Sequence, residues 1–208
     1  MTAFFRNYFI KKFSIVAFLA LFFSGLSILL GVHITVSQQM IELKASQRQK
    51  VQAEKNLMEH LLDEAVLDLI TMSESQLFLR FFNNKDQTIT NQDDFNELLK
   101  SLFEQKPNYY QLRHIDTKGM EVFRIERKKG KPYVCKSDEL QDKSQRYYFQ
   151  KSIDLNRGEF YVSPFDLNIE HGEIELPFRP MIRICIPVFE NDGNKLGINV
   201  LNYDGTSV

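Results

Sequence analysis

The N-terminal region lacks charge over most of its length. No charged side chain occurs between Lys12 and Glu42, and the stretch Phe13–Val36 is almost wholly apolar. As a helix that stretch would be roughly 36 Å long, which is enough to cross a bilayer core of about 30 Å. The sequence therefore predicts a transmembrane helix over residues 13–36, with the lipid bilayer as one partner of the chain.

The charges around this stretch predict its orientation. Three basic residues precede it: Arg6, Lys11 and Lys12. The first basic residue after it is Lys44, so the positive-inside rule keeps residues 1–12 in the cytoplasm and places residues from 37 onward outside. A cleaved signal peptide is the alternative, but its apolar core would run only about 7–15 residues. Because Phe22-Phe23-Ser24-Gly25 is also a poor cleavage site, we expect an uncleaved anchor.

Other absences narrow the class of protein. The formal net charge is -1, which does not favour nucleic acid as a partner. Phosphate loops, zinc-ligand spacings and nucleophile elbows are missing, so neither an enzyme, a metal site nor a cofactor is expected. The only cysteines are Cys135 and Cys185, far apart in sequence. They are either two free thiols in strands or, since export would permit it, a disulfide.

Residues 37–72 contain neither glycine nor proline and are rich in good helix formers. Apolar residues alternate there at spacings of four and three, which is a heptad seam: Met58, Leu62, Ala65, Leu69 and Met72. We expect the transmembrane helix to continue into this stalk as one helix, exposed at first and then buried. The seam fits a homodimer stalk, and it fits equally a helix packed on its own domain.

The rest of the chain predicts an α+β domain over residues 73–205. Helical patches run 75–82 and from about 92 to Pro107, and 137–155 mixes helix and loop. Alternating residues predict about five antiparallel strands, over 109–116, 120–128, 159–163, 181–189 and 196–203. Gly119 and Asp192-Gly193 mark two hairpin turns, and Lys129–Pro132 marks another turn. Helices covering one face of such a sheet complete the expected fold.

Three blocks resemble the PAS-like double-Cache sensor domains of bacterial histidine kinases and diguanylate cyclases. The blocks are Tyr110–Asp116 with Gly119–Val122; Arg146–Phe149 with Tyr161–Asn168; and Pro180–Arg183 with Pro187–Phe189, Gly197-Ile198 and Leu201–Tyr203. The resemblance spans about residues 10–205. It implies a periplasmic or extracellular input module, anchored in the bacterial inner membrane and membrane-distal within a two-component or cyclase protein. We expect the chain to be a fragment or the product of a broken gene that ends within 206–208, before a second membrane helix and a kinase or GGDEF output domain; a functional truncated protein is the alternative.

The resemblance also implies a ligand site. In the amino-acid-binding branch, an Arg and a Trp-Tyr pair hold the ligand's carboxylate, and an Asp holds its ammonium group. Arg146 stands at the Arg, Tyr148 at the Trp, Phe149 at the Tyr, and Asp166 at the Asp. Two of these four positions differ from the family pattern, which leaves open an amino acid, another carboxylate or an amine. Arg183 either faces the same pocket or lies on an exposed sheet face.

Two functions follow as hypotheses. The first is a membrane-anchored, extracytoplasmic ligand-sensing input domain that lacks its output domain. The second is a membrane-tethered dimeric scaffold that binds a partner through its stalk and takes no small ligand. An acidic run, Glu170, His171, Glu173 and Glu175, is typical of a solvated loop rather than of a metal site.

Overall fold

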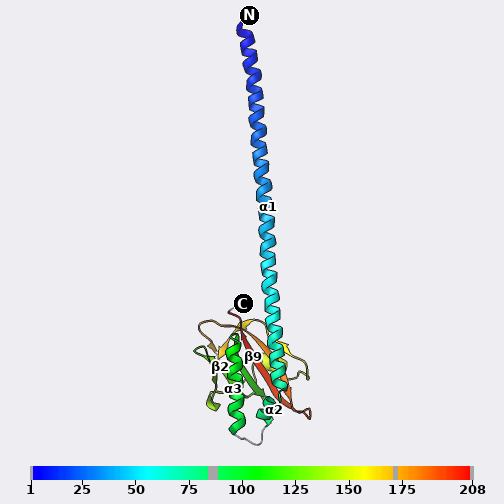
Figure 1. Ribbon diagram of the computed structural model, residues 1–208, viewed down its shortest axis with the longest axis vertical. Helices are drawn as coiled ribbons and strands as arrows, with labels where there is room; N and C mark the ends of the chain where they lie inside the picture. Colours follow the sequence, from blue (N-terminus) through cyan, green and yellow to red (C-terminus); the bar gives the residue numbers. More distant parts are fainter. Residues whose placement is uncertain (1, 84–88, 171–172, 207–208) are drawn as a thin grey trace. The chain divides into compact units, whose positions relative to one another are not determined.

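The computed structural model describes residues 2–83, 89–170 and 173–206. It divides into two compact units, Met1–Leu57 and Met58–Val208, and the boundary falls inside the first helix. That helix, α1, covers Thr2–Glu74, so the two predicted helical segments are one continuous element (Figure 1). No proline occurs before Pro107 to interrupt it. As predicted, its residues are exposed in the early stalk and buried later, at Ala65 and Leu69.

Ser75 separates α1 from the next helix. The backbone N–H of Ser75 donates to the carbonyl of Met72 at 3.2 Å, which closes the last turn of α1. The hydroxyl of Ser75 accepts from the backbone N–H of Phe78 at 3.2 Å, as an N-cap residue does. Helix α2 then covers Gln76–Asn83 and α3 covers Ile89–Gln105. The chain therefore turns sharply at the end of α1 and places three helices together.

Within the described residues the main sheet has seven strands, in the order β3-β2-β1-β9-β8-β4, and β5 also pairs with β8. All pairings are antiparallel. The bounds are β1 Tyr109–Asp116, β2 Glu121–Lys128, β3 Lys131–Val134, β4 Tyr161–Val162, β5 Asp166–Leu167, β8 Pro180–Phe189 and β9 Lys195–Asp204. A separate hairpin joins β6 Ile169–Glu170 to β7 Glu173–Ile174. The short helices between β3 and β4 are η1 Ser137–Glu139 and α4 Tyr147–Ser152.

The α+β fold and both predicted hairpins are confirmed. Gly119 and Gly193 have φ of 93° and 94°, a conformation that favours glycine. A Cβ atom at Gly119 would also lie 2.4 Å from the Cβ atom of Ser144. The strand count was too low, because β3, β5, β6 and β7 have only two to four residues and show no periodicity. The turn predicted to reach Pro132 ends earlier, since Lys131 already pairs with β2.

The two faces of the sheet are covered differently. The later turns of α1, with α2 and α3, pack on one face and form the main apolar core with alternate strand residues such as Leu112, Ile184 and Leu201 (Figure 1). A smaller apolar cluster lies on the opposite face, where Ile198 and Val200 contact α4. Side chains alternate between the two faces along each strand. Many of the strand positions that point to the α4 side but lie outside this cluster carry polar residues.

Candidate ligand-binding site

A row of buried polar side chains crosses the sheet on the face that α4 covers. Three of them follow a half-buried glutamate, and the four lie opposite one another on adjacent strands, β2 to β1 to β9 to β8: Glu126, Gln111, Asn202 and Arg183. The Gln111 Nε2 donates to Glu126 Oε2 at 3.0 Å, and Asn202 Nδ2 donates to Gln111 Oε1 at 2.9 Å. We call this row, together with Arg113 and Arg124 beside it, the polar layer. Every residue in it is fixed by cross-strand pairing.

Charges concentrate around Glu121 at one end of the polar layer. Its fully buried carboxylate lies 3.0 Å from Arg124 Nη1, 3.4 Å from Arg113 Nε and 3.9 Å from Lys143 Nζ. It also accepts the backbone N–H of Gln141 at 3.1 Å. One anion thus holds three buried cations and the chain that leads into α4, which fixes the position of that helix.

Helix α4 brings two of the predicted site residues to this face. Tyr148 is buried, with 1% of its surface exposed, and its hydroxyl accepts from Arg113 Nη1 at 2.9 Å. Arg146 is the N-cap residue of α4 and is half-buried. The guanidinium carbons of Arg146 and Arg183 lie 5.7 and 5.3 Å from the centroid of the Tyr148 ring. Both guanidinium groups therefore lie within cation–π distance of the same aromatic ring.

The other two predicted residues meet beside them. Asp166 in β5 forms an ion pair with Arg183 in β8, and it accepts a hydrogen bond from the Tyr147 hydroxyl at 2.6 Å. Burial, followed by this hydrogen bond to a carboxylate, raises the pKa of Tyr147. Phe149, by contrast, packs in the apolar cluster of this face. The structure thus gathers Arg146, Tyr148, Asp166 and Arg183 in one place.

Two buried polar atoms in this place have no hydrogen-bond partner among the described residues. They are the Nε of Arg183 and the Oδ1 of Asn202, on side chains that are 1% and 0% exposed. The two residues are direct cross-strand neighbours. An unpaired buried donor or acceptor is costly, by about 1–3 kcal/mol each. The face thus holds one unpaired donor and one unpaired acceptor on neighbouring strands.

Sequence reasoning missed most of the polar layer. Gln111, Arg113 and Arg124 appeared only as alternating strand residues, and their contacts with Glu121 and Tyr148 depend on the pairing of distant segments. A strand that carries several charged residues on one face was the available signal. Such a strand has its charged face either exposed to solvent or buried under another element. Only the position of α4 shows that this face is buried.

The opposite face holds one buried histidine. His114 Nδ1 lies 2.7 Å from Asn199 Oδ1, and Asn199 Nδ2 donates to the Ser73 hydroxyl at 2.7 Å. The ring packs 4.0 Å, centroid to centroid, from Phe82. Burial lowers the pKa of His114 to about 4, so the ring is neutral at pH 7. This chain of contacts fastens the end of α1 to the two central strands.

The acidic run is solvated as predicted only in part. Glu173 is exposed. Glu175 accepts from the Tyr110 hydroxyl at 2.6 Å and from Asn168 Nδ2 at 2.8 Å, so it holds the β6–β7 hairpin and is not solvated as predicted. The side chain of Glu170 and all of His171 lie outside the described residues. Among those that are described, no group of three His, Cys, Asp or Glu could hold a metal ion. Cys135 and Cys185 are both free thiols.

Comparisons with known proteins agree with this architecture. A family model described as bacterial histidine kinase, sensor domain, matches residues 37–207. A domain of a sensory box/GGDEF family protein from Vibrio parahaemolyticus is 24% identical, with a TM-score of 0.61, over 72% of this chain and 54% of that one. The extracellular domain of vpHK1S-Z8, described as a histidine kinase, is 26% identical with a TM-score of 0.61, over 72% and 51%.

The chain spans about half the length of these solved chains. No curated protein sequence matches it. Within the part of the chain that the structure describes, one helix is long and apolar enough to cross a membrane, and its apolar window is unburied and near the N-terminus.

Proposed function

The chain belongs to the family of bacterial histidine kinase sensor domains, and from this premise we propose that it is an extracytoplasmic ligand-sensing input domain. Sensor domains of this family are non-catalytic, so the chemistry of signalling belongs to an output domain. We propose a kinase or GGDEF domain as the output of the parent protein. The cross-strand polar layer is the observation that carries the sensing role, because it is a buried polar site rather than a second apolar core.

The charges of the site favour a small molecule that bears a carboxylate. Arg146 and Arg183 both lie against Tyr148, whereas Asp166 is the one acid among the four predicted residues. A guanidinium binds a carboxylate through two parallel hydrogen bonds. The Nε–H group of Arg183 has no acceptor among the described residues and could donate one of them. An ammonium group on the same ligand would pair with Asp166 in competition with Arg183. The proposed ligands are therefore carboxylates, amino acids among them.

The proposed topology follows from the apolar helix. Residues 1–12 would be cytoplasmic, 13–36 would cross the inner membrane, 37–72 would form the stalk and 73–205 the periplasmic or extracellular module. A fusion of alkaline phosphatase after residue 208 should be active in the periplasm, and a fusion of green fluorescent protein there should be dark. If the phosphatase fusion is inactive and the green fluorescent protein fusion is fluorescent, residue 208 lies in the cytoplasm and the proposed orientation is wrong.

The structure limits how a dimer could form. The seam residues Ala65 and Leu69 are buried in the chain's own core, and Met58, Leu62 and Met72 pack against that core. We propose that a homodimer uses the exposed part of the stalk, residues 37–57, where Leu43, Val51 and Leu57 are exposed. Ligand binding would shift the buried end of α1 and transmit the shift along the same helix.

A thermal-shift experiment tests the ligand site. The full chain in detergent is heated with a panel of carboxylates, amino acids and amines. A binding carboxylate should raise the melting temperature, and Arg146→Gln, a change at a half-buried residue, should weaken its affinity by about tenfold or more. Arg80→Gln, an exposed residue of α2, is the matched control and should have no effect.

Two results would contradict the proposal. One is that no carboxylate in the panel stabilises the chain. The other is stabilisation that survives unchanged in both Arg146→Gln and Arg183→Gln. If no ligand binds while cysteines introduced in residues 37–57 cross-link the chain into dimers, the scaffold function is the better account.

A further inference from the structure

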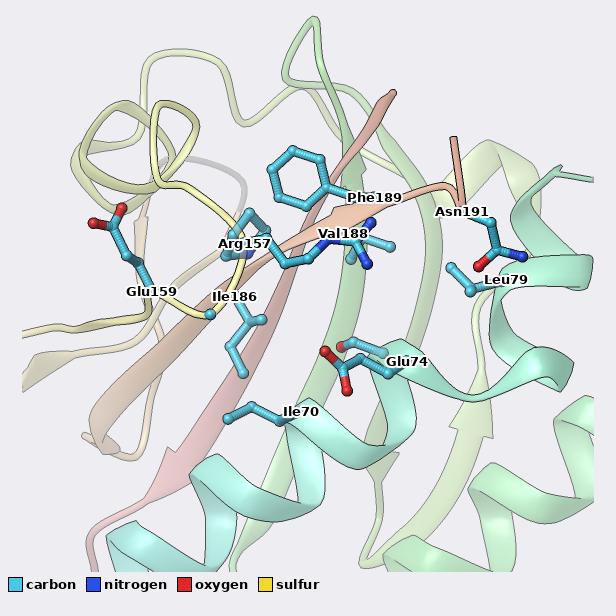
Figure 2. A pocket seen from close by; sticks show the side chains of 12 residues that line it. Ile70, Glu74, Leu79, Arg157, Glu159, Ile186, Val188, Phe189 and Asn191 are labelled. Atoms are coloured by element: carbon cyan, nitrogen blue, oxygen red, sulfur yellow. The ribbon is translucent and has the colours of Figure 1, made fainter. Parts of the chain in front are cut away.

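A separate hollow of about 220 Å³ lies at the end of α1, beside the outer edge of β8 (Figure 2). Three α1 residues form one wall: Ile70, Ser73 and Glu74. The others come from α2, from the loop after α4 and from the end of β8. The hollow is smaller than the volume of about 300–1,000 Å³ usual for drug-sized ligands, so a compact molecule fits it.

The strand edge in the hollow is open. Strand β4 pairs with β8 only at Ile184 and Cys185, and the described residues add no strand alongside Ile186–Phe189. The N–H and C=O groups of Arg183 point toward β4, because Ser163 accepts the one and donates to the other. The backbone N–H and C=O groups of every second residue in a strand point to the same side. The carbonyl of Pro187, four residues after Arg183, therefore also faces the open edge. Pro187 has no N–H to leave unpaired there, so the edge offers an acceptor to a ligand.

The two cations near this hollow are already held by acceptors. The Arg157 guanidinium donates to the carbonyl of Glu190 at 2.8 Å and lies 5.4 Å from the centroid of the Phe189 ring. Lys195 donates to the carbonyls of Ile153 and Leu155 and lies 5.1 Å from the same centroid. Neither side chain therefore needs an anion to complete its contacts.

Glu74 is placed differently. It is the last residue of α1, where the helix dipole is negative, so its carboxylate stands at the end that disfavours a negative charge. The carboxylate has no hydrogen-bond or ion-pair partner among the described residues. In Figure 2 it points into the hollow, on the side opposite the Arg157 guanidinium. The aliphatic side chains of Ile70 and Ile186 lie at one end of the same space.

We propose that this hollow is a second binding site, for a small organic ammonium ion with a short aliphatic body. The ammonium group bonds to the Glu74 carboxylate and to the Pro187 carbonyl, and the aliphatic part contacts Ile70 and Ile186. The ligand thus compensates both the Glu74 charge and the negative end of the α1 dipole. The site shares no residue with the polar layer and does not depend on the carboxylate proposed there.

The position of the site gives the ligand a direct effect on α1. Ser73 lines the hollow and also accepts the hydrogen bond from Asn199, so the final turn of α1 is held both by the sheet and by the bound amine. An amine bound at Glu74 therefore stabilises the packed position of the helix that leads to the N-terminus. A sensor with this arrangement responds to two chemically different compounds.

Isobutylammonium chloride is the probe, tested on the full chain in detergent against sodium isobutyrate and isobutanol at equal ionic strength. At a concentration tenfold above its Kd, isobutylammonium should stabilise the chain by RT ln 11 and so raise the melting temperature by about 3–6 °C. The two isosteres should not. Glu74→Gln should weaken the amine's affinity about fivefold without lowering the melting temperature of the unliganded chain, because Glu74 is exposed and its charge is unfavourable at the end of α1.

Two controls separate this site from the polar layer. Asp166→Asn should leave amine binding intact, and Glu104→Gln, an exposed glutamate of α3, should do the same. Arg157→Gln removes a positive charge from the opposite wall and should retain or strengthen binding. The proposal is overturned if isobutyrate stabilises as well as the amine, if the amine binds Glu74→Gln as tightly as it binds the unsubstituted chain, or if a folded Asp166→Asn variant no longer binds the amine.

Discussion

Replacing Glu121 by glutamine should destabilise the domain more than any other single charge change described above. Its carboxylate is fully buried and lies within 4 Å of Arg113, Arg124 and Lys143. The three cations are themselves at most 5% exposed, so removal of the negative charge leaves them without their shared anion. Breaking a buried ion pair by removing one partner costs about 3–5 kcal/mol.

A loss of stability in this range can be measured by thermal or urea unfolding. For a domain of this size about 3 kcal/mol corresponds to a fall in melting temperature of roughly 6–12 °C. Urea unfolding of the full chain in detergent, followed by tyrosine fluorescence because the chain has no tryptophan, measures the change in free energy. Glu97→Gln is the matched control, since its ion pair with Lys100 is exposed and is worth about 0–1 kcal/mol. A loss below about 1 kcal/mol for Glu121→Gln would refute the buried charge cluster.

Three further predictions concern the core and its titratable groups. Leu69→Ala in α1 should cost about 2–5 kcal/mol in urea unfolding, whereas Leu57→Ala, 55% exposed, should be close to neutral; equal effects would contradict the burial of α1. Because burial lowers the pKa of His114 to about 4, the unfolded chain binds a proton first as pH falls below about 6.5, and stability should decline between pH 6.5 and 4. His114→Gln should flatten that decline in unfolding measured at pH 7, 6 and 5, and an unchanged slope would refute it. Burial raises the pKa of the Cys135 and Cys185 thiols to about 11 and about 12, so neither should react quickly with a disulfide reagent at pH 8, and fast native-state labelling would contradict this.

Sequence patterns predicted the elements in which apolar residues recur regularly over many residues. The helix through Leu69 and the hairpins at Gly119 and Gly193 follow from periodicity and turn chemistry, which are local properties of the chain. The first two residues of β3, Lys131 and Pro132, were predicted as part of a turn, because four residues carry too little alternation to identify a strand. The stalk seam was ambiguous for a physical reason: the same apolar stripe packs equally on a partner helix or on a sheet.

The candidate site was only partly predictable. Arg146, Tyr148, Asp166 and Arg183 came from a family resemblance, and the structure places them together. The contacts that position them are non-local. Tyr148 meets Arg113 across 35 residues, and Asn202 meets Gln111 across 91. Such pairs depend on strand order and register, which no local pattern in the sequence specifies.

The central claim is that a carboxylate binds at the polar layer and that α1 responds. Hydrogen–deuterium exchange of the full chain in detergent, with and without the carboxylate that stabilises it most, tests this directly. We expect slower exchange in peptides that cover α4, β5 and the middle of β8, together with residues 58–74 of α1. Protection confined to the end of β8 and to residues 157–159, with α4 and β5 unchanged, would contradict the account.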